Sequence, residues 1–428
     1  MRPAKMLTTL GLLAGTSILL AGCGTTTTPA AQPKDVELRM TVWTANEDQL
    51  ALFDEIAQEY IADHPEVKSV TFEPLPFEDY TTTLTTQVAG GKAPDLAWIL
   101  ENAALDFVES GALAPIQKSL EKTDGYEIDD LNEAATALWK KDGELIAYPF
   151  STSPFVMFAN DDLLKAAGQP SAAELQAAGK WNWEGISEVG AAVNAATSKA
   201  GFVVRDFDYT TWDNLASVWM GWGAEPWGDN GASCEFDSPE MVDAFTFLHQ
   251  AAFDKQSMPG PGTTADFFAG ESAFTVTQIS RASVLPEAGF AWDLLPLPEG
   301  PKGNYSMVGQ AGIGVMAKGE NTAVATDFLA FFSNPENSKK LAQWFPPARS
   351  SQLTTETLAA ANPVLSEEHI DKVVIPGIET GVVRPGHTDS AKVGQTVRAA
   401  LDAVWTPDAD VKESLAGVCA AVDPLLGK

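Results

Sequence analysis

Apolar positions in the first third of the chain follow two alternating periods. Residues 36–43 (VELRMTVW) alternate apolar with polar side chains, which predicts a strand with one distinctly more apolar face. After Asn46 apolar residues recur at helical spacing; a second strand (SVTFEPLP, 69–76), a helix at about 80–88 and a third strand within GGKAPDLAWIL (90–100) follow. This alternation predicts parallel strands joined by right-handed crossovers, and hence an α/β fold.

The spacing of apolar residues along the chain changes at residue 143. The stretch GELIAYPFSTSPFVMFAN (143–160) consists of two apolar runs split by the polar segment STSP. Helices are predicted at 160–167, where Gly168 can end the helix, and at about 183–198. The following stretch, 205–231, carries four of the 12 tryptophans.

The first 22 residues have the layout of a secretory signal peptide. Arg2 and Lys5 precede an uncharged, largely apolar segment, 6–22, which ends at Cys23. A membrane-spanning helix is the alternative, but this segment is short for a span and is interrupted by threonines and glycines. Residues 24–34 lack apolar periodicity and are rich in Thr, Pro, Ala and Gln, which predicts a tether.

Length and charge narrow the class of protein. A chain of 428 residues, less the signal and the tether, suits two domains. Its 27 basic and 58 acidic residues give a net charge of −31. Nucleic acid and anionic lipid headgroups are therefore not expected as partners, because both require clustered Lys and Arg.

The histidines and cysteines predict no metal site and no cofactor. The four histidines belong to no CxxC, HExxH or clustered His/Cys pattern. Besides Cys23, only Cys234 and Cys419 remain. Outside the cytoplasm a disulfide between them is favoured over two separately buried thiols, although burial alone remains the alternative.

Several short stretches resemble, in their order and spacing, one protein family. It is that of the extracellular solute-binding proteins of ABC importers, in particular the sugar-capturing class to which maltose-binding protein belongs. The matching stretches are APDLAWI, ESGALAPI, YPFSTSPFVMFANDDLLKAAG, WNWEGISEVGAAV, DSPEMVDAFTFL, FFAGESAF, LLPLPEGPKG and GIGVMAKGENTAVATDFLAFFSNPE. Residues 20–23 (LAGC) also resemble the lipobox of bacterial lipoproteins, which implies cleavage before Cys23 and acylation of that residue.

The resemblance implies two α/β lobes, each with a mixed sheet, and a ligand cleft between them where strand ends meet. The implied division of the chain is a signal peptide at 1–22, the lipidated cysteine and tether at 23–35, a first lobe of 36–145 and 264–312, and a second lobe of 146–263 and 313–428. The implied function is that of a monomeric receptor, lipid-anchored outside the cell membrane, which captures a sugar or short oligosaccharide by hinge closure. It would deliver the ligand to a membrane permease and would not be an enzyme.

A sugar site requires planar polar groups for the hydroxyl edges and aromatic rings for the C–H faces. At the strand ends of the first lobe, the candidates are Trp43, Asn46, Glu47, Glu101 and Asn102. Of these, Asn46 is more simply explained as a helix cap.

Two further candidates lie where the chain is expected to cross between lobes. Ser151, followed by Thr152 and Ser153, can bond either a ligand or its own backbone. Gln310 stands where the family often has small residues, and its amide suits a hydroxyl.

The tryptophan-rich stretch supplies five candidates. Asp208, Tyr209 and Trp212 lie in a loop without periodicity. Trp219 and Trp222 are three residues apart, so they share one helix face. One of these two rings is predicted to stack on a sugar, and burial of both in the core is the alternative.

Basic residues motivate a rival ligand class. Arg281 stands where many relatives carry an aromatic residue, and Arg349 and His387 lie in second-lobe loops. The three suggest an anionic solute such as a sugar acid or a phosphorylated polyol. The family's late aromatic residue near His387 is absent, which argues against a long oligosaccharide.

A surface glycoside hydrolase is the rival from another class. Such an enzyme needs two carboxylates flanking one bond, and Glu47, Glu101 and Asp208 are the available acids. Nothing in the sequence marks one of them as a tuned acid, and the family resemblance implies binding only.

Overall fold

The computed structural model describes residues 35–205, 212–228, 231–384 and 386–426. The expected signal peptide, Cys23 and nearly all of the tether lie outside the described residues. Asp208 and Tyr209 lie outside them as well.

A nine-stranded sheet extends through both halves of the molecule, in the order β2-β1-β3-β12-β6-β10-β7; in addition, β11 pairs with β6 and β13 pairs with β12. Its strands are β1 (Val36–Val42), β2 (Val67–Pro74), β3 (Leu96–Leu100), β6 (Ala147–Asn160), β7 (Ala200–Val204), β10 (Ser272–Gln278), β11 (Trp292–Leu295), β12 (Met307–Val315) and β13 (Val382–Val383). Two small pairs are β4 (Lys140–Lys141) with β5 (Glu144–Leu145), and β8 (Trp227–Gly228) with β9 (Ser233–Cys234).

The helices differ widely in length. The α-helices are α1 (Glu47–Asp63), α2 (Tyr80–Ala89), α3 (Ala104–Glu109), α4 (Gln117–Leu120), α5 (Glu133–Thr136), α6 (Asp161–Ala166), α7 (Ala172–Ala177), α8 (Trp183–Thr197), α9 (Ala216–Trp219), α10 (Pro239–Phe253), α11 (Thr322–Phe332), α12 (Pro335–Leu341), α13 (Thr355–Ala361), α14 (Glu367–His369), α15 (Ile375–Thr380), α16 (Ser390–Leu401) and α17 (Val411–Val422). Short 3₁₀ turns include η1 (Glu101–Ala103), η4 (Trp212–Leu215), η7 (Ile279–Glu287) and η8 (Ser350–Gln352), and η9 (Ile370–Val374) is a π-helical turn.

The strand and helix alternation predicted for the start of the mature chain is confirmed. β1 pairs in parallel with both β2 and β3. Helix α1 begins after Asn46, whose side-chain oxygen accepts a hydrogen bond from the backbone N–H of Gln49 at 3.0 Å. The cap role therefore accounts for Asn46.

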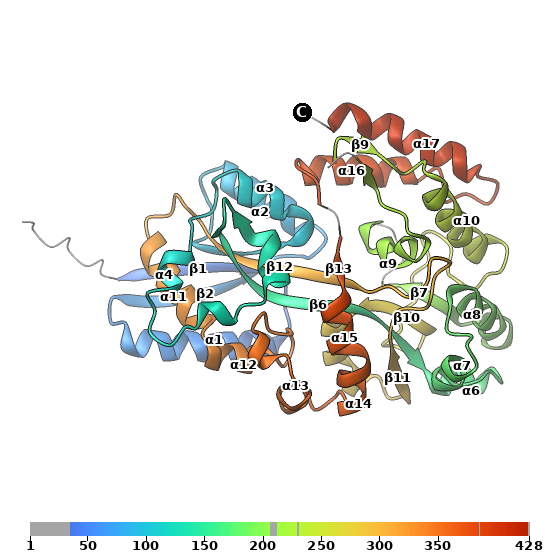
Figure 1. The fold of residues 1–428 in the computed structure, drawn as a ribbon, viewed down its shortest axis with the longest axis horizontal. Helices are drawn as coiled ribbons and strands as arrows, with labels where there is room; N and C mark the ends of the chain where they lie inside the picture. Colours follow the sequence, from blue (N-terminus) through green and yellow to red (C-terminus); the bar gives the residue numbers. More distant parts are fainter. Residues whose placement is uncertain (1–34, 206–211, 229–230, 385, 427–428) are drawn as a thin grey trace, which may run out of the picture.

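The stretch read as two apolar runs is a single strand. β6 is continuous over 14 residues and is buried along its whole length. It pairs antiparallel with β12 from Ala147 to Pro154 and with β10 from Phe155 to Ala159. The segment STSP thus lies inside a strand that joins the two halves, in the middle of Figure 1.

Three clusters of buried apolar side chains form the core. The first contains residues from 36–150 and 311–345, and the second contains residues from 155–307 and 393–426. The third, smaller cluster joins β6 and η7 to residues within 358–374. We refer to the elements around the first cluster as the first lobe and to those around the other two as the second lobe.

This packing differs from the division of the chain expected from the sequence. β10, expected in the first lobe, pairs with β6 and β7, and its Phe274 and Val276 lie in the second cluster. Helix α11, expected in the second lobe, contributes Phe328 and Phe332 to the first cluster. The reason is that the return crossing is β12, which pairs antiparallel with β3, rather than the segment that begins at residue 264.

The second lobe contains a disulfide between Cys234 in β9 and Cys419 in α17, whose Cα atoms are 5.3 Å apart. Both residues belong to the second core cluster. The bond therefore joins two elements of one lobe and does not cross between the lobes.

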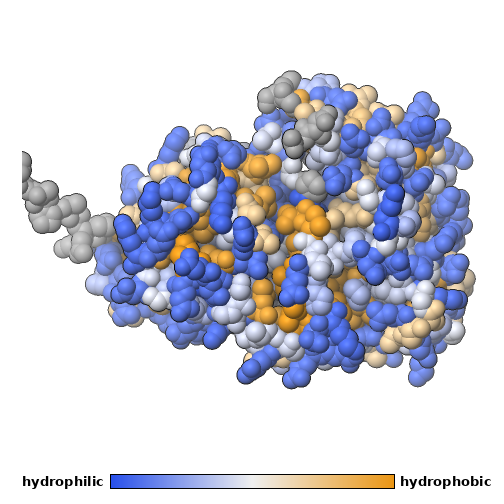
Figure 2. Space-filling model, in the orientation of Figure 1, coloured by the Kyte–Doolittle hydropathy of each residue, from blue (hydrophilic) through white to orange (hydrophobic). Residues whose placement is uncertain are grey.

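Hydrophilic residues cover most of the face seen in Figure 2, and apolar residues show in patches in its middle. Within the described ranges no helix is long and apolar enough to cross a membrane. The same ranges contain no group of three or more His, Cys, Asp or Glu side chains that could hold a metal ion.

A partly buried pair, Asp293 and His369, makes stability depend on pH. His369 Nε2 lies 3.1 Å from Asp293 Oδ1, and this hydrogen bond from His369 is the main cause that lowers the pKa of Asp293, against the opposing effect of burial. A lowered folded-state pKa contributes stability above the unfolded pKa, which is lost as the pH falls through the folded pKa.

We therefore expect Asp293→Asn to lower the free energy of unfolding by about 1 kcal/mol at pH 6 and by much less at pH 2. Urea unfolding at both pH values measures the difference. The exposed carboxylate of Asp408 provides the control, because Asp408→Asn should change neither value noticeably. Equal destabilisation by Asp293→Asn at pH 6 and pH 2 would contradict the assignment.

Candidate ligand site between the lobes

A cavity of about 230 Å³ lies between the two lobes. On the first-lobe side its lining includes Phe77, Glu78 and Asp79, which lead into α2, and Asn102, which follows β3. On the second-lobe side the lining comes from η4, from Trp227, from the segment that connects β13 to α16 and from α16 itself. Side chains of both lobes thus face one space that is partly open to solvent, as a hinged binding site requires.

Arg384 lines this cavity and is almost fully buried. Its Nε donates a hydrogen bond to Glu101 Oε1 at 2.9 Å, and its Nη2 contacts the same oxygen. Its Nη1 donates to Asn214 Oδ1 at 2.9 Å and lies 3.0 Å from Asp213 Oδ2. One guanidinium therefore joins a first-lobe carboxylate to the η4 turn of the second lobe.

The charges around Arg384 hold it in the cationic form. Burial alone would lower the pKa of Arg384, but Asp213 and Glu101 outweigh burial and raise the pKa. Asn102 Nδ2 donates a further hydrogen bond to Asp213 Oδ2 at 3.3 Å, again across the boundary between the lobes. The carboxyl end of β3 thus places Glu101 and Asn102 side by side at this boundary.

Aromatic rings continue the site on the first-lobe side. Trp43, directly after β1, is partly exposed and packs edge-on against Phe77, Tyr80 and Trp98. Across the boundary, the guanidinium of Arg205, after β7, lies 4.4 Å from the centre of the Phe77 ring. Trp43 thus supports the Phe77 ring that lines the cavity.

The structure brings three of the sequence-predicted candidates to the cavity wall. These are Asn102, Trp212 and His387. Glu101 is 2% exposed and contacts Arg384. The two ring nitrogens of His387 face the backbone oxygens of Thr388 and Gly231.

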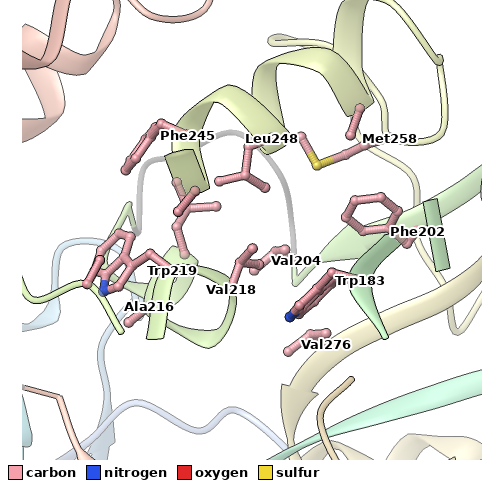
Figure 3. Packing of buried hydrophobic residues seen from close by; sticks show 14 of the residues in the cluster. Trp183, Phe202, Val204, Ala216, Val218, Trp219, Phe245, Leu248, Met258 and Val276 are labelled. Carbon is pink, nitrogen blue, oxygen red and sulfur yellow. The ribbon is translucent and has the colours of Figure 1, made fainter. Parts of the chain in front are cut away.

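Trp219 lies in the second-lobe core, and Trp222 packs against that core. Trp219 is 2% exposed and packs among Trp212, Phe236 and Phe245. Figure 3 shows Trp219 among apolar side chains of α9 and α10. Trp222 contacts Phe247. Both rings contact α10, and the alternative of core burial is confirmed for Trp219, whereas Trp222 is only partly buried.

Arg349 and Gln310 are buried with partners from the protein. The Arg349 guanidinium donates to the backbone oxygens of Glu127 and Ser333 and stacks on the Tyr126 ring. Gln310 Nε2 donates to the backbone oxygen of Ala134 at 3.3 Å. Arg349 therefore packs within the first lobe rather than in a second-lobe loop, away from the cavity wall.

The remaining candidates lie elsewhere. Arg281 stacks on Phe268 beside the third cluster. Glu47 is exposed in the first turn of α1. Ser151 is 7% exposed within β6, opposite Ala311 of β12. None of these three lines the interlobe cavity.

Sequence reasoning missed Arg384, Asp213 and Phe77. A weak signal for the first was present, since Arg384 stands three residues before His387, which was singled out. Asp213 follows Trp212 directly. Phe77 lies in the connection between β2 and α2, whose length gives no indication that it reaches the boundary between the lobes.

A family model described as "bacterial extracellular solute-binding protein" matches residues 55–363. The chain belongs to this family of bacterial extracellular solute-binding proteins. The family is one of solute-binding proteins, so this chain is a binding protein and not an enzyme.

Relatives agree with this assignment. An uncharacterised lipoprotein encoded in the oleD 5′ region of Streptomyces antibioticus is 25% identical over 363 residues, which cover 80% of this chain and 77% of the relative. The fold matches that of the substrate-binding protein Lmo0181 of Listeria monocytogenes in complex with cycloalternan, with a TM-score of 0.78, 23% identity and coverage of 92% and 99%. It also matches UgpB of Mycobacterium tuberculosis in complex with glycerophosphocholine, with a TM-score of 0.75, 18% identity and coverage of 91% and 98%. These two structures show the two-lobe fold of solute-binding proteins.

Proposed function

We propose that this solute-binding protein captures a small neutral carbohydrate in the interlobe cavity and presents it to the permease of an ABC importer. Ligand contacts from both lobes would favour the closed arrangement over an open one, with β6 and β12 as the strands about which the lobes move. The lipobox-like residues support attachment of the chain to the outer face of the cell membrane through Cys23.

The observation that carries the neutral ligand is the charge of the cavity. The buried cation, Arg384, is already in contact with two carboxylates, Glu101 and Asp213. Glu78 and Asp79 add further acidic groups to the lining. Counting the exposed Arg398, the lining has three carboxylates, Glu78, Asp79 and Asp213, against two guanidinium groups. An anionic solute would therefore still meet more negative than positive side chains, whereas sugar hydroxyls can both donate to carboxylates and accept from the guanidinium groups and from Asn102.

The geometry also favours a small solute. The cavity of about 230 Å³ is below the range of roughly 300–1,000 Å³ that is usual for drug-sized ligands. Phe77, Trp212 and Trp227 supply ring surfaces for the C–H faces of a sugar ring. The matched structures hold cycloalternan and glycerophosphocholine respectively, so likeness alone leaves the ligand class open.

The basic residues behind the anionic alternative give it little support. Arg349 is bonded within the first lobe, and both ring nitrogens of His387 face backbone oxygens. Arg281 stacks on Phe268. Arg281 and Arg349 thus lie away from the cavity lining, and the ring nitrogens of His387 are engaged by the backbone rather than directed at a ligand.

Calorimetric titration tests the proposal with neutral mono- and disaccharides, the matching uronic acids and sugar phosphates, sn-glycerol-3-phosphate and glycerophosphocholine. We expect binding from the neutral sugars only. Asn102→Ala should weaken that binding at least about tenfold, because it removes a polar group of the cavity wall. Glu47→Ala, at an exposed site on α1, is the matched control and should leave binding unchanged. Tight binding confined to the anionic compounds would overturn the proposal.

A further inference from the structure

A carboxylate of the first lobe caps a helix of the second. Asp106 in α3 accepts hydrogen bonds from the backbone N–H groups of Asp389 and Ser390, at 2.7 and 2.9 Å, and from Ser390 Oγ at 2.7 Å. Helix α3 belongs to the first lobe through Phe107 and Val108, whereas α16 belongs to the second. The two helices lie in the two halves of Figure 1.

Helix α16 depends on this carboxylate of the other lobe because its own N-cap residue makes no side-chain capping bond. Asp389, the residue at its N-cap position, has a left-handed backbone (φ 56°) and makes no side-chain capping bond. The first N–H groups of a helix need acceptors, and its positive dipole end favours a negative charge there. Asp106 meets both requirements, but only while the lobes are together.

We infer that Asp106 is a positioning residue that sets ligand affinity by stabilising the closed arrangement, without touching the ligand. The inference rests on the proposed function, since it presumes that binding requires closure. Asp106 does not line the cavity, whereas Ser390, which it holds, does. Separation of the lobes would replace three charge-assisted hydrogen bonds by contacts with water, so their free energy biases the equilibrium toward closure.

The consequence for binding follows from population arithmetic. The apparent dissociation constant is the intrinsic constant divided by the fraction of molecules in the binding-competent arrangement. Loss of Asp106 lowers that fraction, so every ligand of the cavity should bind more weakly, with little change in selectivity. Ligand release should also become faster, because release requires opening.

The chain offers a matched control in Asp130. Its carboxylate accepts a backbone N–H and a hydroxyl hydrogen bond from a single serine, Ser351, at 2.9 and 2.7 Å. This contact stays on the first-lobe side, where the neighbouring Arg349 is bonded to Glu127 and Ser333. It has the same chemistry as the Asp106 contact but does not cross the boundary between the lobes.

The experiment compares Asp106→Ala, the milder Asp106→Asn and Asp130→Ala in the full chain. Spin labels on Lys122→Cys in the first lobe and Lys412→Cys in the second, both exposed positions, report the distance between the lobes without ligand. Titration with the neutral sugar that binds wild type best reports affinity, and circular dichroism confirms folding. We expect the Asp106 variants to lengthen the distance and to weaken binding by about 5- to 30-fold. Asp130→Ala should change neither.

The two readouts separate failure of this inference from failure of the proposed function. Wild-type distances and affinity in folded Asp106 variants, or equal effects from Asp130→Ala, would overturn the role of Asp106. A longer distance in the Asp106 variants, with no neutral sugar bound by wild type, would leave the Asp106 contact supported and refute the proposed ligand class.

Discussion

Replacing Arg384 with methionine is expected to abolish solute binding and to lower the free energy of unfolding by about 3–5 kcal/mol. Methionine keeps an unbranched apolar stem but lacks the guanidinium, so Glu101, which is 2% exposed, loses the cation that compensates its burial. Asp213 and Asn214 lose their partner as well. The loss therefore combines an uncompensated buried carboxylate with a broken link between the two lobes.

Denaturant unfolding and calorimetric titration measure the two effects. Arg398→Met is the matched control, because Arg398 lines the same cavity but is exposed, and its stability effect should stay within about 0.5 kcal/mol. Adding Glu101→Gln to Arg384→Met should restore part of the stability but not the binding, since it removes the unpaired charge and not the missing donor. An unchanged free energy of unfolding in the Arg384 variant would contradict a stabilising role for the contact between Arg384 and Glu101.

Local periodicity sufficed for the elements of the first third of the chain. The alternation from Val36 to Val42 and the helix after Asn46 depend on short-range spacing, and both have the predicted bounds to within a few residues. The same reasoning misread β6, because a polar segment with a proline usually ends a strand. Here Ser151, Thr152 and Ser153 stay in the strand because β12 pairs alongside them, a partner more than 150 residues away.

Assignment of segments to lobes failed for the same physical reason. Strand β10 joins the second lobe because it pairs with β6 and β7. Helix α11 joins the first lobe because it packs on the sheet beside β3. Sequence spacing contains no information on such long-range pairing. Reasoning from strand ends, in contrast, located Glu101 and Asn102 at the boundary between the lobes, because the position where β3 ends is a local property.

The aromatic and basic candidates show the limit of residue type as a guide. Trp219 and Arg349 have the chemistry of ligand contacts, but each is buried among partners from the protein. Arg384 has the same chemistry as Arg349 and lines the cavity. What separates the two arginines is tertiary placement: Arg349 bonds backbone oxygens within one lobe, whereas Arg384 bonds carboxylates of both.

Removing the disulfide by Cys234→Ser and Cys419→Ser together is expected to lower the free energy of unfolding by about 2–5 kcal/mol. The bond closes a loop of 185 residues, and its loss restores conformational entropy to the unfolded chain. Both cysteines lie in the second-lobe core, so the loss should fall on the unfolding of that lobe. It should leave the Asp106 and Arg384 contacts in place.

Urea unfolding with and without a reductant measures the effect. The reduced wild type and the double serine variant should share one lowered midpoint, and the variant should not respond to reductant. Cys234 lies in β9, which pairs with β8 and hence with Trp227 of the cavity wall. At urea concentrations below the unfolding transition, ligand affinity should nevertheless change by less than about threefold. The reason is that Trp227 keeps its contacts with Phe236 and His387. Equal midpoints for oxidised and reduced wild type would contradict a stabilising role, and a large loss of affinity would show that the disulfide, rather than ring packing, positions Trp227 at the cavity wall.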